Sequence, residues 1–258
     1  MFKRLAERGL GLAVGLVLPA LLYLLWLAAV QHRWLPEQIL PAPDLVWQSA
    51  GELWESGELQ GHLLVSARRV AWSLLIGGGV GLVLGLAMGL SRSLRAYLFP
   101  TFDVASQFPV LGWIPLLIIF AGIDEALKIS AISIAVIVPV AVNTLRGIEN
   151  IPAAMFEVCR VYGFTQLQVV RRLVLPAAAP SLFNGLRQAV MQAWLTLVFV
   201  ELLASSEGIG YLMVWGRQLA QLDLVIVAMF VIGIVGVALD LLLRALESRV
   251  AGWRRTAF

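Results

Sequence analysis

Apolar residues along this chain gather into six long runs separated by shorter polar segments. A bilayer core about 30 Å thick is crossed by about 20 residues of α-helix, because each residue adds about 1.5 Å. The runs that meet or approach this length lie near 10–30, 70–90, 97–121, 128–147, 182–205 and 223–243. The pattern predicts an all-α, polytopic membrane protein with six transmembrane helices.

The first run follows Lys3, Arg4 and Arg8, an arrangement that also precedes the apolar part of a signal peptide. Its apolar length of about twenty residues exceeds that of a usual signal peptide, so we interpret it as a retained helix. The third run contains Pro109 and Pro115. Proline lacks an amide hydrogen and collides with the preceding helical turn, so we expect a bend there.

The composition of the chain is far more apolar than that of a soluble domain. Apolar and aromatic residues make up 60% of the chain and charged residues 14%, against about 45–50% and about 25% in soluble proteins. The surplus must face lipid. We therefore expect a lipid bilayer around the chain. The net charge of +3 is small and scattered, so we expect no nucleic acid among the partners.

The chain offers few residues from which a catalytic or metal site could be built. His32, His62 and Cys159 are its complete histidine and cysteine inventory, too few for a disulfide or a zinc site. Neither lysine stands in a phosphate-binding GxxxxGK[ST] loop, and neither HExxH nor GxSxG occurs. We expect no catalytic residue, no metal and no cofactor on this chain, and any ATP-driven work would fall to another chain.

The positions of lysine and arginine predict the orientation in the membrane. Cytoplasmic loops carry an excess of these residues, and with the N-terminus inside, those left outside are Arg33, Arg68, Arg69, Lys128 and Arg217. Both termini are therefore expected in the cytoplasm. We expect Arg68 and Arg69, at the mouth of the second span, to extend their head groups to the membrane interface.

This topology divides the chain into four segments. They are an N-terminal transmembrane helix (1–35), a periplasmic loop or helix (36–66), a core of five transmembrane helices (67–247) that includes a cytoplasmic loop at 149–180, and a cytoplasmic tail (248–258). Within the second span, glycine recurs every four residues at Gly77, Gly81, Gly85 and Gly89. This stripe predicts close packing of a neighbouring helix, because small residues let helix backbones approach in lipid.

The loop at 149–180 has the pattern of two short helices. Pro152 suits a first helical turn, and the apolar pattern then runs to Gly163, a residue suited to a helix C-terminus. Thr165 is the expected N-cap of a second helix that stops at Pro176. Such a pair could insert apolar side chains into a groove of a partner protein or rest on the lipid surface, and the residues alone favour neither.

Several motifs of the chain resemble those of one family of transporters. EVCRVYG, from Glu157 to Gly163, followed by LVLP, from Leu173 to Pro176, is similar to the E-A-A…G…I-x-L-P loop of ABC importer permeases, with Val158 and Cys159 in place of the two alanines. LPAP at 40–43, FPVLGWIP at 108–115, GIDE at 122–125 and SEGIG at 206–210 resemble the nitrate, sulfonate, taurine and bicarbonate branch of this family. GIDEALKI is most similar to aliphatic-sulfonate permeases.

The resemblance implies a type I ABC importer-like permease fold with a cytoplasmic coupling helix. It implies a bacterial inner-membrane complex in which two permease copies, usually a homodimer, join two ATP-binding subunits and a periplasmic substrate-binding protein. ATP and Mg would bind to the partner subunits, and the path would carry a small anion. The residues expected to contact the ATP-binding subunit are Phe156, Glu157, Val158, Cys159, Val161, Tyr162, Gly163, Leu175 and Pro176.

Polar residues inside the apolar spans are candidates for the transport path, because membrane-buried polarity usually faces the bundle interior or water. In the fifth span Gln188, Gln192 and Thr196 share one helical face, with Met191 close by. This face could present amide donors to an oxyanion, or it could hydrogen-bond to another helix or to a second copy. We expect Asp240 and Arg244, four residues apart in the sixth span, to pair on one helix face.

Three residues near the outer end of the fifth span are candidates for a periplasmic gate or a binding-protein contact. Glu201 is expected at the membrane interface, where its charge could also repel an anion. Gly208 and Gly210 follow in an external turn, which turn chemistry alone would also explain. The alternative function for the whole chain is a self-sufficient secondary transporter. Such a protein would require inverted internal repeats and a buried coupling carboxylate, and we find no clear repeat.

Overall fold

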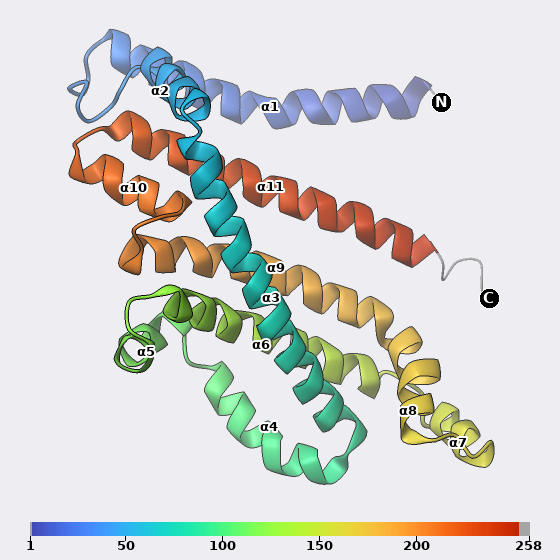
Figure 1. Cartoon of the computed structure of the whole chain (residues 1–258). Helices are drawn as coiled ribbons and strands as arrows, with labels where there is room; N and C mark the ends of the chain where they lie inside the picture. Colours follow the sequence, from blue (N-terminus) through green and yellow to red (C-terminus); the bar gives the residue numbers. More distant parts are fainter. Residues whose placement is uncertain (1, 253–258) are drawn as a thin grey trace. The chain divides into compact units, whose positions relative to one another are not determined.

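The computed structural model describes the backbone of residues 2–252 and the side chains of residues 15 and 17–247. No strand occurs in this part of the chain, and every regular element is helical (Figure 1). The elements are α1 (Phe2–Gln31), α2 (Pro43–Glu55), α3 (Glu58–Leu90), α4 (Arg92–Ser106), η1 (Val110–Trp113), α5 (Ile114–Ala121), α6 (Glu125–Glu149), α7 (Ala153–Val161), α8 (Gln166–Val169), η2 (Val170–Val174), α9 (Leu175–Ala204), α10 (Ile209–Gln218) and α11 (Leu222–Gly252).

Four helical stretches of the described chain are long and apolar enough to cross a membrane. They are Glu58–Leu90, Glu125–Glu149, Gln166–Gln218 and Leu222–Glu247, and they contain the predicted second, fourth, fifth and sixth spans. The predicted first span lies within α1, whose apolar described part, Val17–Gln31, is shorter. The side chains of Lys3, Arg4 and Arg8, and residues 253–258 of the predicted tail, lie outside the described residues.

The predicted third span is not one continuous helix. Its chain forms α4 and then η1 with α5, two helical pieces that meet at an angle of 92°. Pro109 precedes η1 with φ −62° and ψ 134°, an extended conformation that ends helical geometry. The bend expected from the prolines is confirmed at Pro109, whereas Pro115 stands in the first turn of α5, where a missing amide hydrogen costs nothing.

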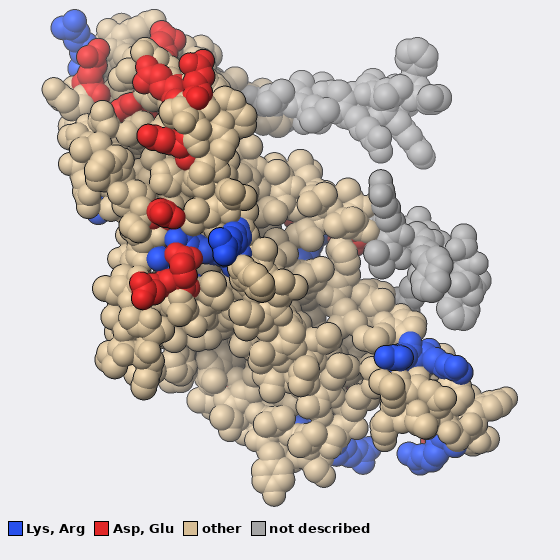
Figure 2. All heavy atoms as spheres, viewed as in Figure 1, with Lys and Arg blue, Asp and Glu red and all other residues tan. Residues whose placement is uncertain are grey.

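The chain divides into two compact units, and the smaller consists of Met1–Gln60 and Leu212–Phe230. In this unit the indole of Trp26 donates a hydrogen bond to the Pro41 carbonyl (3.0 Å) and stacks on Phe230. Ser49 of α2 donates to the carboxylate of Asp223 (2.5 Å). Acidic side chains gather over α2 and its neighbouring loop (Figure 2).

The larger unit consists of Gly61–Tyr211 and Val231–Phe258, and its centre is formed by α3, α6 and α9. Val70 of α3, Ile132 of α6 and Leu197 of α9 belong to one buried apolar cluster. Burying such side chains stabilises each by about 1.5–3 kcal/mol relative to water, but in lipid the specificity comes from close packing.

The glycine stripe of α3 packs directly on α6, as predicted. A Cβ atom at Gly81 would lie 2.8 Å from the Ile137 carbonyl oxygen, and one at Gly85 would lie 2.7 Å from the Ala141 carbonyl oxygen. These helices touch backbone to backbone. Gly78 and Gly79, beside the stripe, have no neighbour within 4 Å of such a Cβ.

Two ends of the α6–α9 pair carry different chemistry. Residues 122–128 and the α9–α10 turn lie at one end, and α7 and α8 lie at the other (Figure 1). The 25 residues of α6 connect these ends over about 37 Å, from the helical rise per residue.

Candidate functional site

The predicted coupling segment forms a short exposed helix. α7 begins after Pro152 and ends at Val161. Gly163 adopts φ +67°, and its amide donates to the Arg160 carbonyl while the Phe164 amide donates to the Cys159 carbonyl. This is the Schellman arrangement that glycine favours at a helix C-terminus. The sequence prediction of a helix closed by Gly163 is confirmed.

Most of the coupling residues lie on the protein surface. Val161 is 85% exposed and Tyr162 75% exposed, and Glu157, Val158 and Pro176 are also exposed. Leu175 is exposed as well. Cys159 is the exception, because its side chain is buried, while Phe156 is partly covered. Apolar side chains this exposed mark a contact surface for lipid or protein.

The second helix of the segment continues into the membrane instead of stopping. Thr165 caps it as predicted: the Thr165 hydroxyl accepts from the Gln168 amide, and the Gln168 side chain accepts from the Thr165 amide. The prediction that it ends at Pro176 is wrong, because α8, η2 and α9 follow one another without a break. The π-turn of η2 includes Arg172, four residues before Pro176, and such a widened turn relieves the usual clash of the proline ring.

Basic side chains surround this end of the larger unit (Figure 2). Arg160, Arg171 and Arg172 are all exposed, and the guanidinium of Arg172 lies 5.5 Å from the centre of the Phe164 ring. The surface around α7 therefore combines apolar and cationic groups.

The predicted polar face of α9 carries a cluster of amides. Asn143 of α6 donates to the Gln188 side-chain oxygen (3.2 Å) and accepts from Asn184 (3.2 Å). Gln188 and Gln192 are exposed, while Met191 is partly covered and Thr196 is buried. The structure thus joins Gln188 to Asn143 and to Asn184, a residue that the sequence reading did not single out, although it lies four positions before Gln188.

An ion network joins α9 and α11. Asp240 pairs with Arg244 (2.7 Å), as predicted from their spacing. Arg187 of α9 also binds Asp240 (2.7 Å) and lies 3.5 Å from Glu247. The predicted one-helix pair is therefore also a link between two helices.

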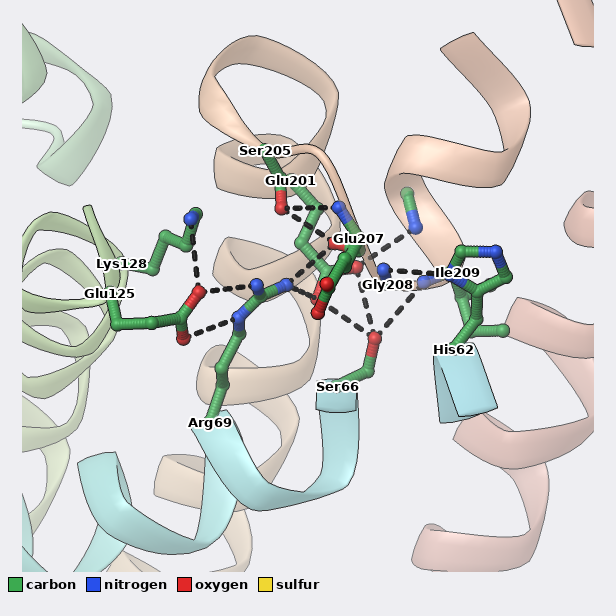
Figure 3. Close-up of polar contacts among 11 residues, drawn as sticks. His62, Ser66, Arg69, Glu125, Lys128, Glu201, Ser205, Glu207, Gly208 and Ile209 are labelled. Carbon is green, nitrogen blue, oxygen red and sulfur yellow. Dashed lines mark hydrogen bonds and ion pairs between the residues drawn. The ribbon is translucent and has the colours of Figure 1, made fainter. Parts of the chain in front are cut away.

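The opposite end of the larger unit contains a buried charge network that the sequence reading missed (Figure 3). Arg69 of α3 is its centre. Its Nη1 donates to Glu201 and to the Glu207 backbone carbonyl, each at 2.7 Å. Its Nε and Nη2 donate to the two oxygens of Glu125, at 2.9 and 2.5 Å. The expectation that Arg69 reaches the membrane interface is wrong, since its side chain is 3% exposed.

Glu201 is buried as well, which corrects its expected interfacial position. Its carboxylate accepts from the Ser66 hydroxyl (2.8 Å), from Arg69 and from the Gly210 amide (2.9 Å). Gly208, with φ +109°, passes so close to this carboxylate that a Cβ would overlap it. The expected turn is present, and both of its glycines meet Glu201.

The first amides of α10 receive their acceptors from distant helices. The Gly208 amide donates to His62 Nδ1 (3.0 Å), the Ile209 amide to the Ser66 hydroxyl (3.0 Å), and the Gly210 amide to Glu201. A helix N-terminus has unsatisfied donors and a partial positive charge, which an acidic side chain stabilises. The network therefore fixes α3, α9 and the start of α10 together.

A pocket of about 430 Å³ opens beside this network. Its lining includes Arg68, Arg69, Glu125, Lys128, Trp72 and Glu207. The Lys128 ammonium is buried and donates to Glu125 (3.0 Å). No group of three or more His, Cys, Asp or Glu side chains suited to a metal ion occurs among the described residues.

The chain is similar in sequence to transport permeases. The family model for binding-protein-dependent transport system inner membrane components matches residues 77–252. A protein named as an aliphatic sulfonates transport permease of Bacillus subtilis is 35% identical over 254 residues, covering 98% of this chain and 92% of the relative. The taurine transport system permease protein of Escherichia coli is 31% identical over 252 residues, covering 96% and 91%.

Solved transporters show the same fold. An amino acid ABC transporter crystallised with histidines superposes with a TM-score of 0.61 at 16% identity, covering 77% of this chain and 97% of that one. A methionine ABC transporter in an inward-facing conformation gives 0.51 at 19% identity, covering 73% and 94%. Fold and sequence together define a transmembrane permease subunit of an ABC importer. The chain belongs to the family of binding-protein-dependent transport system inner membrane components.

Proposed function

We propose that two copies of this chain form the transport path of an ATP-driven importer for small organic sulfonates, the class that includes taurine. The relatives named for aliphatic sulfonates and taurine align with 92–98% of the chain, which supports this cargo. An external binding protein delivers the anion. Two ATP-binding subunits hold ATP and Mg and supply the work, while this chain binds neither.

The main support for the proposal is the exposed surface of α7, where an ATP-binding subunit could bind and transmit its movement to the permease. Val161 and Tyr162 project at the end of α7, which a short turn at 162–165 joins to the continuous helix of α8, η2 and α9. A displacement of α7 by an ATP-binding subunit would therefore reach the membrane span directly, as rigid-body switching requires. Glu157 is exposed beside them and would accept a hydrogen bond from the ATP-binding subunit.

In the proposed orientation α7 and both termini face the cytoplasm. The excess of lysine and arginine on this side supports it, as do the exposed arginines around α7. The Arg69–Glu201 network then lies at the periplasmic end. There Glu201, Gly208 and Gly210 would hold the outer gate by fixing the α9–α10 turn, and Glu201 would act from inside the fold and not as a contact for the binding protein.

The proposed function is tested on the assembled complex. The chain is co-expressed with candidate ATP-binding and binding-protein subunits from the same genome, purified as a complex, and reconstituted in liposomes. Uptake of ³⁵S-taurine and of ³⁵S-ethanesulfonate should require both ATP and the loaded binding protein. Transport by this chain without an ATP-binding subunit would contradict the proposal, and so would a complex that imports neither sulfonate.

Gly163 variants should separate assembly from coupling. Gly163→Ala adds a Cβ atom to a residue with φ +67°. A Cβ in the left-handed region costs about 1–2 kcal/mol. Gly163→Asn tolerates this region better. We expect sulfonate-stimulated ATP hydrolysis to fall several-fold in the Ala variant and further in Gly163→Asp, whose charge also enters the contact, but to be largely kept in the Asn variant.

Because no atom lies within 4 Å of a Cβ at Gly163, this difference reports the backbone conformation and not a clash. ATPase rates and the yield of the copurified complex are measured together. Equal rates and yields in all variants would remove Gly163 from the coupling surface.

We propose that the polar face of α9 lines the transport path. This face is formed by Gln188, Met191, Gln192 and Thr196. Gln192 is exposed and would donate to the sulfonate. Gln192→Ala should raise the KM for sulfonate uptake by about tenfold to a hundredfold, since a hydrogen bond to a charged group contributes about 1.5–3 kcal/mol. Leu195→Ala, on the same helix and also exposed, is the control. Loss of dimer with unchanged KM would instead assign Gln192 to contact between the two copies.

A further inference from the structure

The Arg69 guanidinium, at the centre of the charge network, has two hydrogen-bonding edges with different partners (Figure 3). Arg69 Nη1 is held by Glu201 and by the Glu207 carbonyl, two groups within the fold. Its other edge, Nε and Nη2, donates to Glu125. The side chain of Glu125 is 56% exposed, whereas those of Arg69 and Glu201 are 3% and 0% exposed. Glu125 is thus the member that can leave.

Three donors converge on this one carboxylate. Arg69 Nε reaches Oε2, while Arg69 Nη2 and Lys128 Nζ both reach Oε1. Within the described chain Glu125 is the one hydrogen-bonding partner of the Lys128 ammonium. A carboxylate has two oxygens for these donors, but a sulfonate has three. Arginine binds such oxyanions through two parallel hydrogen bonds, which fixes their orientation.

The space needed for a ligand adjoins the same donors. The pocket of about 430 Å³ is lined by both cations, by Glu125 and by the exposed Arg68. This volume falls within the usual range of about 300–1,000 Å³ for small-molecule sites. Trp72 and Val65 add apolar surface for the carbon part of an organic anion.

We propose that Arg69 and Lys128 form a binding site for the sulfonate group of the cargo, and that Glu125 occupies this site as an internal substitute until the anion arrives. The choice of a sulfonate rests on the function proposed above. Without Glu125, the buried Lys128 ammonium loses its hydrogen-bonding partner and the Nε–Nη2 edge of Arg69 loses its acceptor, and buried charged groups left in this state carry a large cost. Release of Glu125 is therefore coupled to entry of another anion, and Arg69 stays in place because Glu201 continues to hold it.

The proposal predicts that removing the charge of Glu125 tightens sulfonate binding. A site that is free only a tenth of the time binds about tenfold more weakly than a free one. In Glu125→Gln the affinity of the assembled complex for ³⁵S-ethanesulfonate should therefore rise about tenfold. Binding is measured by equilibrium dialysis in nanodiscs, without nucleotide or binding protein. Glu125→Asp, which keeps the charge on a shorter arm, should give an intermediate affinity and serves if the Gln variant does not assemble.

Two controls separate specific exchange from a general change of charge. Glu207→Gln makes the same charge change at the same pocket, but the Glu207 side chain is exposed and only its backbone carbonyl meets Arg69. This variant should alter binding far less than Glu125→Gln does. Lys128→Met should abolish the gain when combined with Glu125→Gln, and ethylammonium, a cation of similar size, should not compete.

The outcomes distinguish this site from the proposed function. If the complex imports sulfonates but Glu125→Gln and Glu207→Gln bind ethanesulfonate equally, the site is overturned and the function stands. If the complex imports no sulfonate, yet Glu125→Gln binds nitrate or bicarbonate more tightly than the unmodified complex, the oxyanion site stands and the cargo is wrong. Unchanged binding of all three anions in Glu125→Gln and Glu125→Asp overturns the proposal.

Discussion

Glu201→Ala is expected to destabilise the subunit by about 3–5 kcal/mol, the usual cost of breaking a buried ion pair by removing one partner. The variant leaves the Arg69 Nη1 edge, the Ser66 hydroxyl and the Gly210 amide without the carboxylate that they share. A loss of this size is a large fraction of the stability of a typical domain. The measurements are the midpoint of thermal unfolding in detergent and the yield of monodisperse protein.

Glu207→Ala is the matched control for Glu201→Ala, because it removes an acidic side chain nearby while its backbone carbonyl still accepts from Arg69. We expect this control to unfold near the temperature of the unmodified protein. The double variant Arg69→Met with Glu201→Leu should lose less stability than the sum of the single changes, since neither charge is left unpaired. Equal unfolding temperatures for Glu201→Ala and Glu207→Ala would refute the account of the network given above.

Gly85→Ala adds only one methyl group, but we expect it to push α3 away from α6 and to lower the stability of the subunit. Its Cβ would lie 2.5 Å from the Thr144 Cβ and 2.7 Å from the Ala141 carbonyl oxygen, and a backbone oxygen cannot rotate away as a side chain can. Overpacking of this kind costs about 1–3 kcal/mol. The loss of stability is measured by denaturant titration in mixed micelles.

Gly79→Ala supplies the comparison within the same helix. No atom lies within 4 Å of a Cβ at Gly79, and alanine is a better helix former than glycine by about 1 kcal/mol. This variant should be at least as stable as the unmodified protein. Equal losses of stability in Gly79→Ala and Gly85→Ala would show that the glycine stripe does not stabilise the close packing of α3 on α6.

The features that the sequence predicted correctly depend on neighbours in the chain. Thr165 and Gln168 form a capping box within one helical turn, and Gly163 closes α7 with bonds to residues three and five positions before the donors. The glycine stripe also repeats along a single helix. Patterns of this kind are visible in a short window, so they could be read without a structure.

The charge network could not be read in this way, because its members are far apart in the chain. Arg69 and Glu201 are separated by 132 positions, and one of the bonds to Arg69 comes from a backbone carbonyl. A signal existed, since arginine at 69 and glutamate at 201 each stand in a largely apolar stretch. Charges of opposite sign in separate spans indicate pairing, but which pair forms depends on how the helices pack.

The boundary of the fifth span was misplaced for a local reason. Proline usually stops a helix, so the sequence predicts a helix end at Pro176. The π-turn at Val170–Val174 shifts the hydrogen-bond register just before it, so the helix passes through. A single wide turn leaves little trace in the hydrophobic pattern, whereas Pro109 coincides with a change of direction of 92°.

The distance in sequence between Arg69 and its partners also sets an order for biosynthesis. The ribosome makes Arg69 first, then Glu125 56 residues later and Glu201 132 residues later. A nascent chain that ends before Glu201 therefore contains a guanidinium on α3 whose inner partner does not yet exist. Completion of the fifth span supplies it, together with the acceptor for the first turn of α10. Until then the cations Arg69 and Lys128 have Glu125 alone as their carboxylate, so an unfinished chain carries one positive charge more at this site than the finished chain does.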